Sequence, residues 1–196
     1  MNKQNPITEK GRLGFAYDLF IASDKKLKAA VEELLKMKVA IEDIRSGRMA
    51  KEVLQAIDYW GEQICTRSVS VHNLVPNYLR YEFVKSIIGQ TIVPTWDTNY
   101  IALGDDATTV AYTDTVLGNE VYRAIFDNRS TGFNVAYLDK FFGSSVVGGN
   151  SYYEIGLFVD GTAGADTGYL FSHVNINETM AANESLTVNA KFTITD

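Results

Sequence analysis

The sequence has little of the material from which metal sites and nucleophilic sites are usually built. It contains one cysteine, Cys65, and two histidines, His72 and His173, among 196 residues. A single cysteine excludes an intrachain disulfide and a Cys-x-x-Cys metal site, and neither histidine has a second ligand at metal-binding spacing. We therefore expect no metal and no cofactor, a buried inert thiol at Cys65, and structural or surface roles for both histidines.

Recognisable catalytic and phosphate-binding motifs are also missing. Ser144–Ser145 lacks the Gly-x-Ser-x-Gly pattern of a nucleophile elbow, and no glycine-rich phosphate loop is present. Glu154 lies between apolar neighbours in an expected strand, and a buried carboxylate there needs a partner, for which Arg123 is a candidate. The sequence predicts that the protein is not an enzyme. A depolymerase would need two carboxylates about 5 to 9.5 Å apart in a cleft, and no such pair is indicated.

Long apolar runs and an excess of basic residues are absent as well. No stretch approaches the roughly 18 apolar residues of a membrane helix. The net charge of -6 and the pI near 5.0 argue against a general nucleic-acid-binding role. The charge is unevenly divided, because residues 1–90 carry a net +3 and residues 91–196 a net -9. We expect neither a membrane nor a nucleic acid among the partners.

The first part of the chain has a helical pattern. Ser23 is a candidate N-cap, and the run from Ser23 to Ile44 repeats apolar residues at alternating spacings of three and four, which is a short heptad seam. Two interpretations are open: a helical hairpin that covers its own core, or a helix that self-associates about a symmetry axis. In the second interpretation the assembly seam comprises Leu27, Leu34, Met37, Ile41 and Ile44. Further helices are expected from Met49 to Cys65 and from Tyr78 to Ile88.

The second part of the chain has the composition and alternation of strands. Strands are expected at Asn99–Leu103, Glu120–Asp127, Phe133–Phe142, Ser151–Val159, Gly168–Ile176 and Ser185–Thr195, separated by Gly, Asn and Asp turns. The sequence therefore predicts an α+β protein in which an N-terminal helical region is followed by a small antiparallel β-sandwich. Residues 1–90 are expected to form a helical assembly or anchoring region, and residues 91–196 the β-sandwich module.

Several short segments of residues 70–196 resemble a pattern found in structural proteins of tailed-bacteriophage virions. The segments are Tyr100-Ile-Ala-Leu-Gly104, Thr113-Asp-Thr-Val-Leu-Gly-Asn-Glu120, Tyr153-Glu-Ile-Gly-Leu-Phe158 and Leu186-Thr-Val-Asn-Ala-Lys-Phe192. Tail-fibre, baseplate and other minor virion proteins share this pattern. The resemblance implies a β-rich structural module located in the virion, with no catalytic residues to carry over. The chain departs from the usual pattern after Gly104, where it reads Asp-Asp-Ala-Thr-Thr without a proline.

The resemblance, the heptad seam and the expected β-sandwich all lead to the same expected function. The protein is expected to be a structural component of the tail, baseplate, neck or capsid surface. Its expected partners are copies of itself and other virion proteins, and threefold symmetry would suit both fibres and short bundles. The alternative is a module that binds the host surface or a carbohydrate. Its candidate stacking residues are Trp96, Tyr112, Tyr152, Tyr153 and Tyr169.

Overall fold

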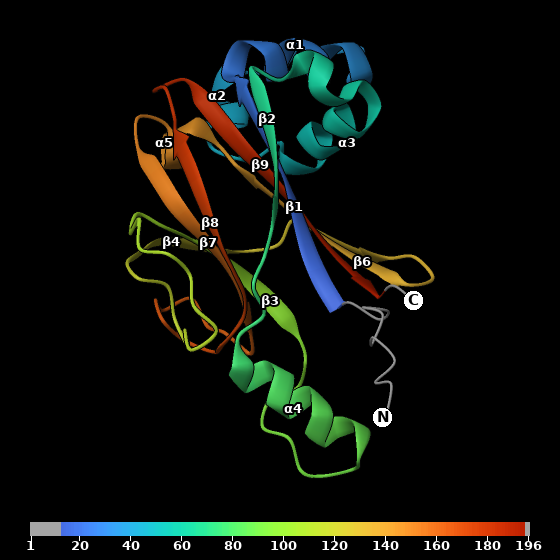
Figure 1. Ribbon diagram of the computed structural model, residues 1–196. Coiled ribbons are helices and arrows are strands. Elements are labelled where there is room, and N and C mark those ends of the chain that lie inside the picture. Colours follow the sequence, from blue (N-terminus) through green and yellow to red (C-terminus); the bar gives the residue numbers. More distant parts are fainter. Residues whose placement is uncertain (1–12, 195–196) are drawn as a thin grey trace, which may run out of the picture.

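The protein is built around two antiparallel β-sheets. Figure 1 shows the computed structural model, which describes residues 13–194; residues 1–12 and 195–196, at the ends of the two predicted regions, lie outside the described part. The five-stranded sheet has the order β2 (Arg67–His72), β1 (Leu13–Ser23), β9 (Glu184–Ile194), β6 (Val135–Phe142) and β5 (Asn128–Thr131). The four-stranded sheet has the order β4 (Glu120–Ile125), β3 (Thr98–Gly104), β7 (Ser151–Val159) and β8 (Tyr169–Thr179).

The main core lies between these two sheets. In β9, Leu186, Val188 and Ala190 are fully buried, because alternate side chains of a strand point to the same face. They belong to one cluster with Ile101 and Leu103 of β3 and with buried residues of β1, β6 and β7. Two sheets that share one apolar core form a sandwich-like arrangement, and the expected mixed α+β architecture is therefore confirmed.

The order of the elements differs from the prediction, because a strand precedes the first helix. β1 pairs along its whole length with β9 and on its other side with β2. Its inward residues Tyr17, Leu19 and Ile21 are completely buried. The five-stranded sheet thus contains two strands from residues 1–90 and three from residues 91–196, so it crosses the predicted division near residue 90.

Helices α1 (Asp24–Leu35), α2 (Ile41–Arg45) and α3 (Ala50–Trp60), followed by a 3-10 turn η1 (Gly61–Ile64), form a cap at one end of the five-stranded sheet. Their apolar faces pack on Phe141 of β6 and on Ala22 of β1 in a second core cluster. The cap is therefore joined to the sheet by a continuous apolar core.

The prediction of one continuous helix from Ser23 to Ile44 is wrong. α1 ends at Leu35, because Lys36 adopts a left-handed conformation with φ of 55° and the chain turns. The Glu32 carboxylate accepts the Val39 N–H at 2.9 Å just beyond this turn. Ser23 occupies the N-cap position without a side-chain capping bond. The break separates the residues of the predicted seam, which are Leu27, Leu34, Met37, Ile41 and Ile44.

The remaining elements agree well with the expected ones. α4 (Asn77–Ile87) begins one residue earlier than predicted, and β7 has the predicted bounds. The sequence reading missed β1, β2 and β5, and also the short helix α5 (Ser144–Val147). In Figure 1, α4 lies at the end of the molecule opposite the helical cap. It contacts the body mainly through β8.

Candidate functional site

A long loop between β3 and β4, residues 105–119, is fastened to the four-stranded sheet by polar side chains. Asn175 of β8 accepts the N–H of Val110 and donates to the carbonyl of Thr108, both at 2.9 Å. Glu154 of β7 accepts the N–H of Gly118 at 3.0 Å and that of Asn119 at 2.9 Å. The loop backbone therefore finds its hydrogen-bond partners in side chains of the strands rather than in a ladder.

His173 of β8 lies between two carboxylates. Its Nε2 atom is 2.8 Å from Oε2 of Glu154, and its Nδ1 atom is 2.9 Å from Oδ2 of Asp114 in the loop. Glu154 and His173 are almost completely buried. Each ring nitrogen of His173 therefore has a carboxylate oxygen within hydrogen-bonding distance. Neither ring nitrogen then remains free for a ligand.

The expected pairing of Glu154 with Arg123 is wrong. Arg123 forms a bidentate pair with Glu120 at 2.7 Å and donates to the carbonyl of Thr167. Its guanidinium lies 4.1 Å from the centre of the Phe158 ring. The prediction that His173 has a structural role fits its position, whereas its two carboxylate partners could not be identified from the sequence.

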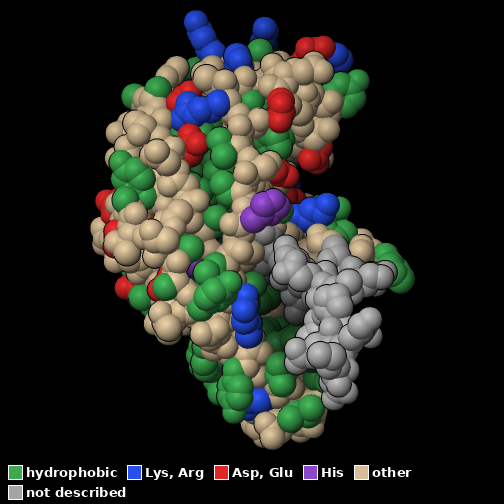
Figure 2. All heavy atoms as spheres, viewed as in Figure 1, with side chains coloured by type: hydrophobic (Ala, Val, Ile, Leu, Met, Phe, Trp, Pro, Cys, Tyr) green, Lys and Arg blue, Asp and Glu red, His purple; other side chains and the backbone are tan. Residues whose placement is uncertain are grey.

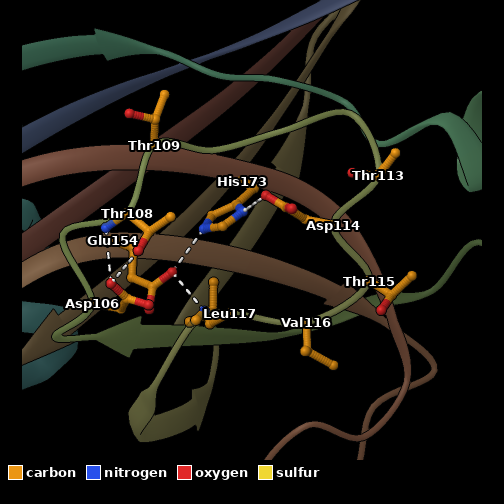
Figure 3. Close-up of a pocket in the computed structure, with 11 residues that line it drawn as sticks. Asp106, Thr108, Thr109, Thr113, Asp114, Thr115, Val116, Leu117, Glu154 and His173 are labelled. Carbon is orange, nitrogen blue, oxygen red and sulfur yellow. Dashed lines mark hydrogen bonds and ion pairs between the residues drawn. The ribbon is translucent and has the colours of Figure 1, made fainter.

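A cavity of about 340 Å³ opens beside His173 (Figure 3). Glu154 and His173 form its floor, and Asp114 approaches from the loop. Thr108 donates its hydroxyl and its N–H to Asp106, which holds the pKa of that carboxyl below its usual value. The lining also includes Thr109, Thr113, Thr115, Val116, Leu117 and Gly118. The cavity is therefore polar and acidic, and its buried groups are already paired with one another.

Three of the four segments that carry the virion-protein pattern meet at this loop, whereas the segment of residues 186–192 lies in β9 of the other sheet. A side chain at Gly104 would place its Cβ 2.3 Å from Glu154, and one at Gly118 would place its Cβ 2.3 Å from Asp106. A Cβ at Gly156 would lie 2.7 Å from Leu117, a buried residue of the loop. These glycines are required by close packing rather than by backbone conformation. The pattern thus describes one packed unit in which the loop is held on the sheet.

α4 is connected to the same unit at its beginning. Leu74 and His173 exchange two backbone hydrogen bonds, of 2.9 and 3.0 Å. The N–H of Asn77 donates to the carbonyl of Tyr112 at 2.8 Å, and the Arg80 guanidinium lies 4.6 Å from the centre of the Tyr112 ring. The start of α4 is therefore positioned by the loop and by β8.

The inner side of α4 forms one wall of an apolar groove of about 880 Å³. Four aromatic rings follow one another along it with centroid separations of about 6 Å: Phe83, Trp96, Phe171 and Phe192. Trp96 has a φ of 65°, which is uncommon for a bulky residue. Its ring contacts Phe83 on one side and Phe171 on the other. Helix α4 thus stands away from the sheet with aromatic side chains between them.

Apolar side chains of α4 are exposed on its outer side and along the rim of the groove, which Val84 and Ile87 also line. Tyr81, Val84, Ile87 and Ile88 are 55 to 67% exposed, and Val93 after the helix is 57% exposed. Figure 2 shows hydrophobic side chains at the lower end of the molecule, where Figure 1 places α4. We call Tyr81, Val84, Ile87 and Ile88 the α4 patch. Contiguous exposed apolar surface of this kind commonly marks an interaction site.

The predicted assembly seam is divided between core and surface. Leu27 and Ile44 are fully buried in the core of the chain itself, so they are not available to a second subunit. Leu34 and Ile41 are half-buried, and Met37, just after the break, is 59% exposed. The apolar surface that the structure exposes lies on α4 instead. Sequence reasoning found this helix but not its exposed apolar side chains, although apolar residues occur on all sides of it in the sequence.

The candidate carbohydrate-stacking residues do not share a surface. Tyr152 is buried, and Tyr169 stacks on Tyr78 at 5.3 Å. Trp96 lies in the groove, and Tyr153 is half-buried. Tyr112 is the exposed member of the set, beneath Arg80.

Comparison with known protein families, with curated proteins and with solved structures finds no match to this chain. Within residues 13–194, no helix has the length and apolar character needed to cross a membrane. The same residues bring together no group of three His, Cys, Asp or Glu side chains suited to a metal ion.

Proposed function

We propose that the protein is a structural component of a tailed-phage virion and acts by binding other protein surfaces. The observation that carries the proposal is the α4 patch, in which four large apolar side chains are more than half exposed on one projecting helix. A solvent-exposed patch of this kind is stabilised when another protein covers it, because burial removes apolar surface from water.

The sequence pattern supports the virion assignment. Its residues build the fastened loop of residues 105–119, and this loop in turn positions the start of α4 through Asn77 and Tyr112. The part of the pattern that builds this loop therefore helps to hold the projecting helix in place. The polar cavity at His173 fits a structural role, because Glu154, His173 and Asp114 are joined to each other and to the loop backbone.

The proposal is tested on purified particles. An antibody against the recombinant chain is applied to phage particles that have been banded on a density gradient from cells carrying the encoding genome. We expect labelling at one defined position of the particle, and a fixed copy number by quantitative mass spectrometry. Absence of the protein from intact infectious particles would contradict the proposal. The host-surface alternative predicts instead that the isolated protein binds host cells.

A further inference from the structure

A second exposed apolar surface lies on β4, the edge strand of the four-stranded sheet. Val121 and Ile125 are 45% and 60% exposed, and they share the outward face of the strand because they are four residues apart. Arg123 lies between them on this face, buried in its pair with Glu120 and donating to the carbonyl of Thr167. Within the described residues, β3 is the strand that pairs with β4, so the opposite edge of β4 is open. An open edge with apolar side chains favours pairing or packing with another chain.

The two surfaces differ in charge. Residues 104–122 carry four acidic and no basic residues. Asp105 accepts from the Asn119 amide, and Asp106 accepts from Thr108. The Asp166 N–H donates to Glu120. Within the described part of the chain, no Lys or Arg pairs with the carboxylates of Asp105, Asp106 and Asp166 near the start of β4. Acidic side chains are visible along the left edge of Figure 2, where Figure 1 places β4 and its preceding loop.

On α4 the charges are different. Glu82 is neutralised by Lys85 at 3.0 Å. Arg80 rests on the Tyr112 ring, and no carboxylate pairs with it among residues 13–194. The α4 patch therefore has one uncompensated cation at its beginning, next to its exposed apolar residues.

We propose that α4 of one copy of the chain docks on β4 of a second copy, so that the subunits join head to tail. This inference rests on the proposed assembly function and names its partner. Arg80 then faces the carboxylates of Asp105, Asp106 and Asp166, and the apolar residues of the α4 patch cover Val121 and Ile125. Because the two surfaces differ, the contact is heterologous and builds a ring or a stack.

The dimensions of the two surfaces agree. From Arg80 to Ile88 the helix rises about 12 Å, at about 1.5 Å per residue. From Val121 to Ile125 the strand extends about 13 Å, at about 3.3 Å per residue. With the two elements parallel, the charged start of α4 lies at the acidic start of β4, and the apolar ends meet. Opposite charges steer such an encounter, and the apolar contact supplies most of the affinity.

The experiment measures mass in solution by light scattering and sedimentation, over a range of concentration. The full-length parent is compared with I87E on α4, with I125E on β4, and with Y59E as a matched control. Tyr59 is 75% exposed on α3, away from both surfaces. We expect the parent and Y59E to assemble, and each of I87E and I125E to lose at least tenfold in association constant. Circular dichroism verifies that each variant is folded.

Mixing distinguishes the head-to-tail contact from other interfaces. I87E keeps an intact β4, and I125E keeps an intact α4, so an equal mixture is expected to form dimers but nothing larger. A monomeric parent, assembly of either single variant at the parental level, or a mixture that stays monomeric would each overturn the proposal. Should either variant be unfolded, R80E paired with D105R provides the test: R80E alone weakens association, and the pair restores it. A parent that is present in particles but monomeric in solution overturns this inference alone and leaves the proposed function intact.

Discussion

Oε2 of Glu154 on β7 lies 2.8 Å from Nε2 of His173 on the adjacent strand β8. The pair joins the sheet to the loop of residues 105–119, because Glu154 also accepts two loop N–H groups and His173 also reaches Asp114. Both side chains are buried, so the removal of one partner leaves the other without compensation.

We therefore expect E154Q to lower the free energy of unfolding by about 1 to 3 kcal/mol, since the amide has one acceptor oxygen instead of two and leaves a buried hydrogen-bonding group without its partner. Urea unfolding followed by tryptophan fluorescence measures the change. The control is H72N on β2, whose side chain is exposed and whose replacement should change stability by less than about 0.5 kcal/mol. Equal stability of E154Q and the parent would mean that the loop is not held by this pair.

Asp24 is the second buried carboxylate with several partners. It accepts from Arg45 Nε at 3.0 Å, from the Ser144 hydroxyl at 2.9 Å and from the Ser185 hydroxyl at 3.0 Å. These residues lie on α2, α5 and β9, so Asp24 joins the helical cap to the sandwich.

We expect D24A to lower the free energy of unfolding by about 2 to 4 kcal/mol, because it leaves three buried or half-buried donors without their acceptor. Thermal unfolding followed by circular dichroism measures the loss. E33Q provides the matched control, since Glu33 lies exposed on the same helix. A loss no greater than that of the control would show that the donors find water or other acceptors.

Glu82 makes stability depend on pH at the base of α4. It accepts the Val93 N–H at 3.0 Å and pairs with Lys85, and these contacts hold the pKa of its carboxyl below the ordinary value of 4.5. A lowered pKa in the folded state means that the unfolded chain binds the proton more tightly. The contribution of Glu82 is thus present above the ordinary pKa and is lost as the pH falls through the lowered value.

The stability difference between the parent and E82Q should therefore be largest near neutral pH and should shrink on acidification to about pH 3. Urea titrations at several pH values measure it. E33Q on α1 is the control, because Glu33 is exposed. A difference that does not change with pH would indicate that the charge of Glu82 is irrelevant to folding.

Cys65 behaves as the sequence predicts, as a buried thiol. Its side chain is 8% exposed, and burial raises the pKa of the thiol. The thiolate is the reactive form, so a raised pKa and low exposure both slow modification. We expect a thiol reagent at neutral pH to react with the folded protein at least tenfold more slowly than with the protein in urea. Equal rates would mean that the region around η1 opens readily.

The sequence reveals most of the strands after residue 97, because their alternation is regular and their turns contain Gly, Asn and Asp. It also marks α4, which begins after Pro76 and ends before Gly89. β1 and β2 also carry strand signals, in the apolar run around Leu19 and in the alternation of Val69 and Val71. Neither strand is predicted, because both segments lie beside strong helical patterns. Local periodicity does not reveal that β1 pairs with β9 at the other end of the chain.

The residues of the predicted assembly seam were likewise only partly predictable from the sequence. Leu27 and Ile44 were correctly recognised as apolar positions that require burial, but the turn at Lys36 directs them into the core of their own chain. A left-handed lysine has no clear sequence signature, since glycine or asparagine is the usual residue at such a position. Ile125 lies in a strand that the sequence predicts correctly, yet its side chain is 60% exposed, because β4 is an edge strand. Which strand forms an edge depends on the sheet order, which a single sequence does not supply.

The sheet order leads to a prediction about the two halves of the chain. A fragment of residues 92–196 lacks β1 and β2, so β9 would lose the partner with which it pairs over 11 residues. The fragment would also expose the core face that Tyr17, Leu19 and Ile21 cover in the whole protein. We expect the fragment alone to show a disordered circular dichroism spectrum or to aggregate, because an open apolar sheet edge promotes association. Addition of a fragment of residues 1–91 should restore the β spectrum and a cooperative thermal transition. A monomeric 92–196 fragment that melts cooperatively would mean that the second half folds independently, as the composition of the sequence first indicated.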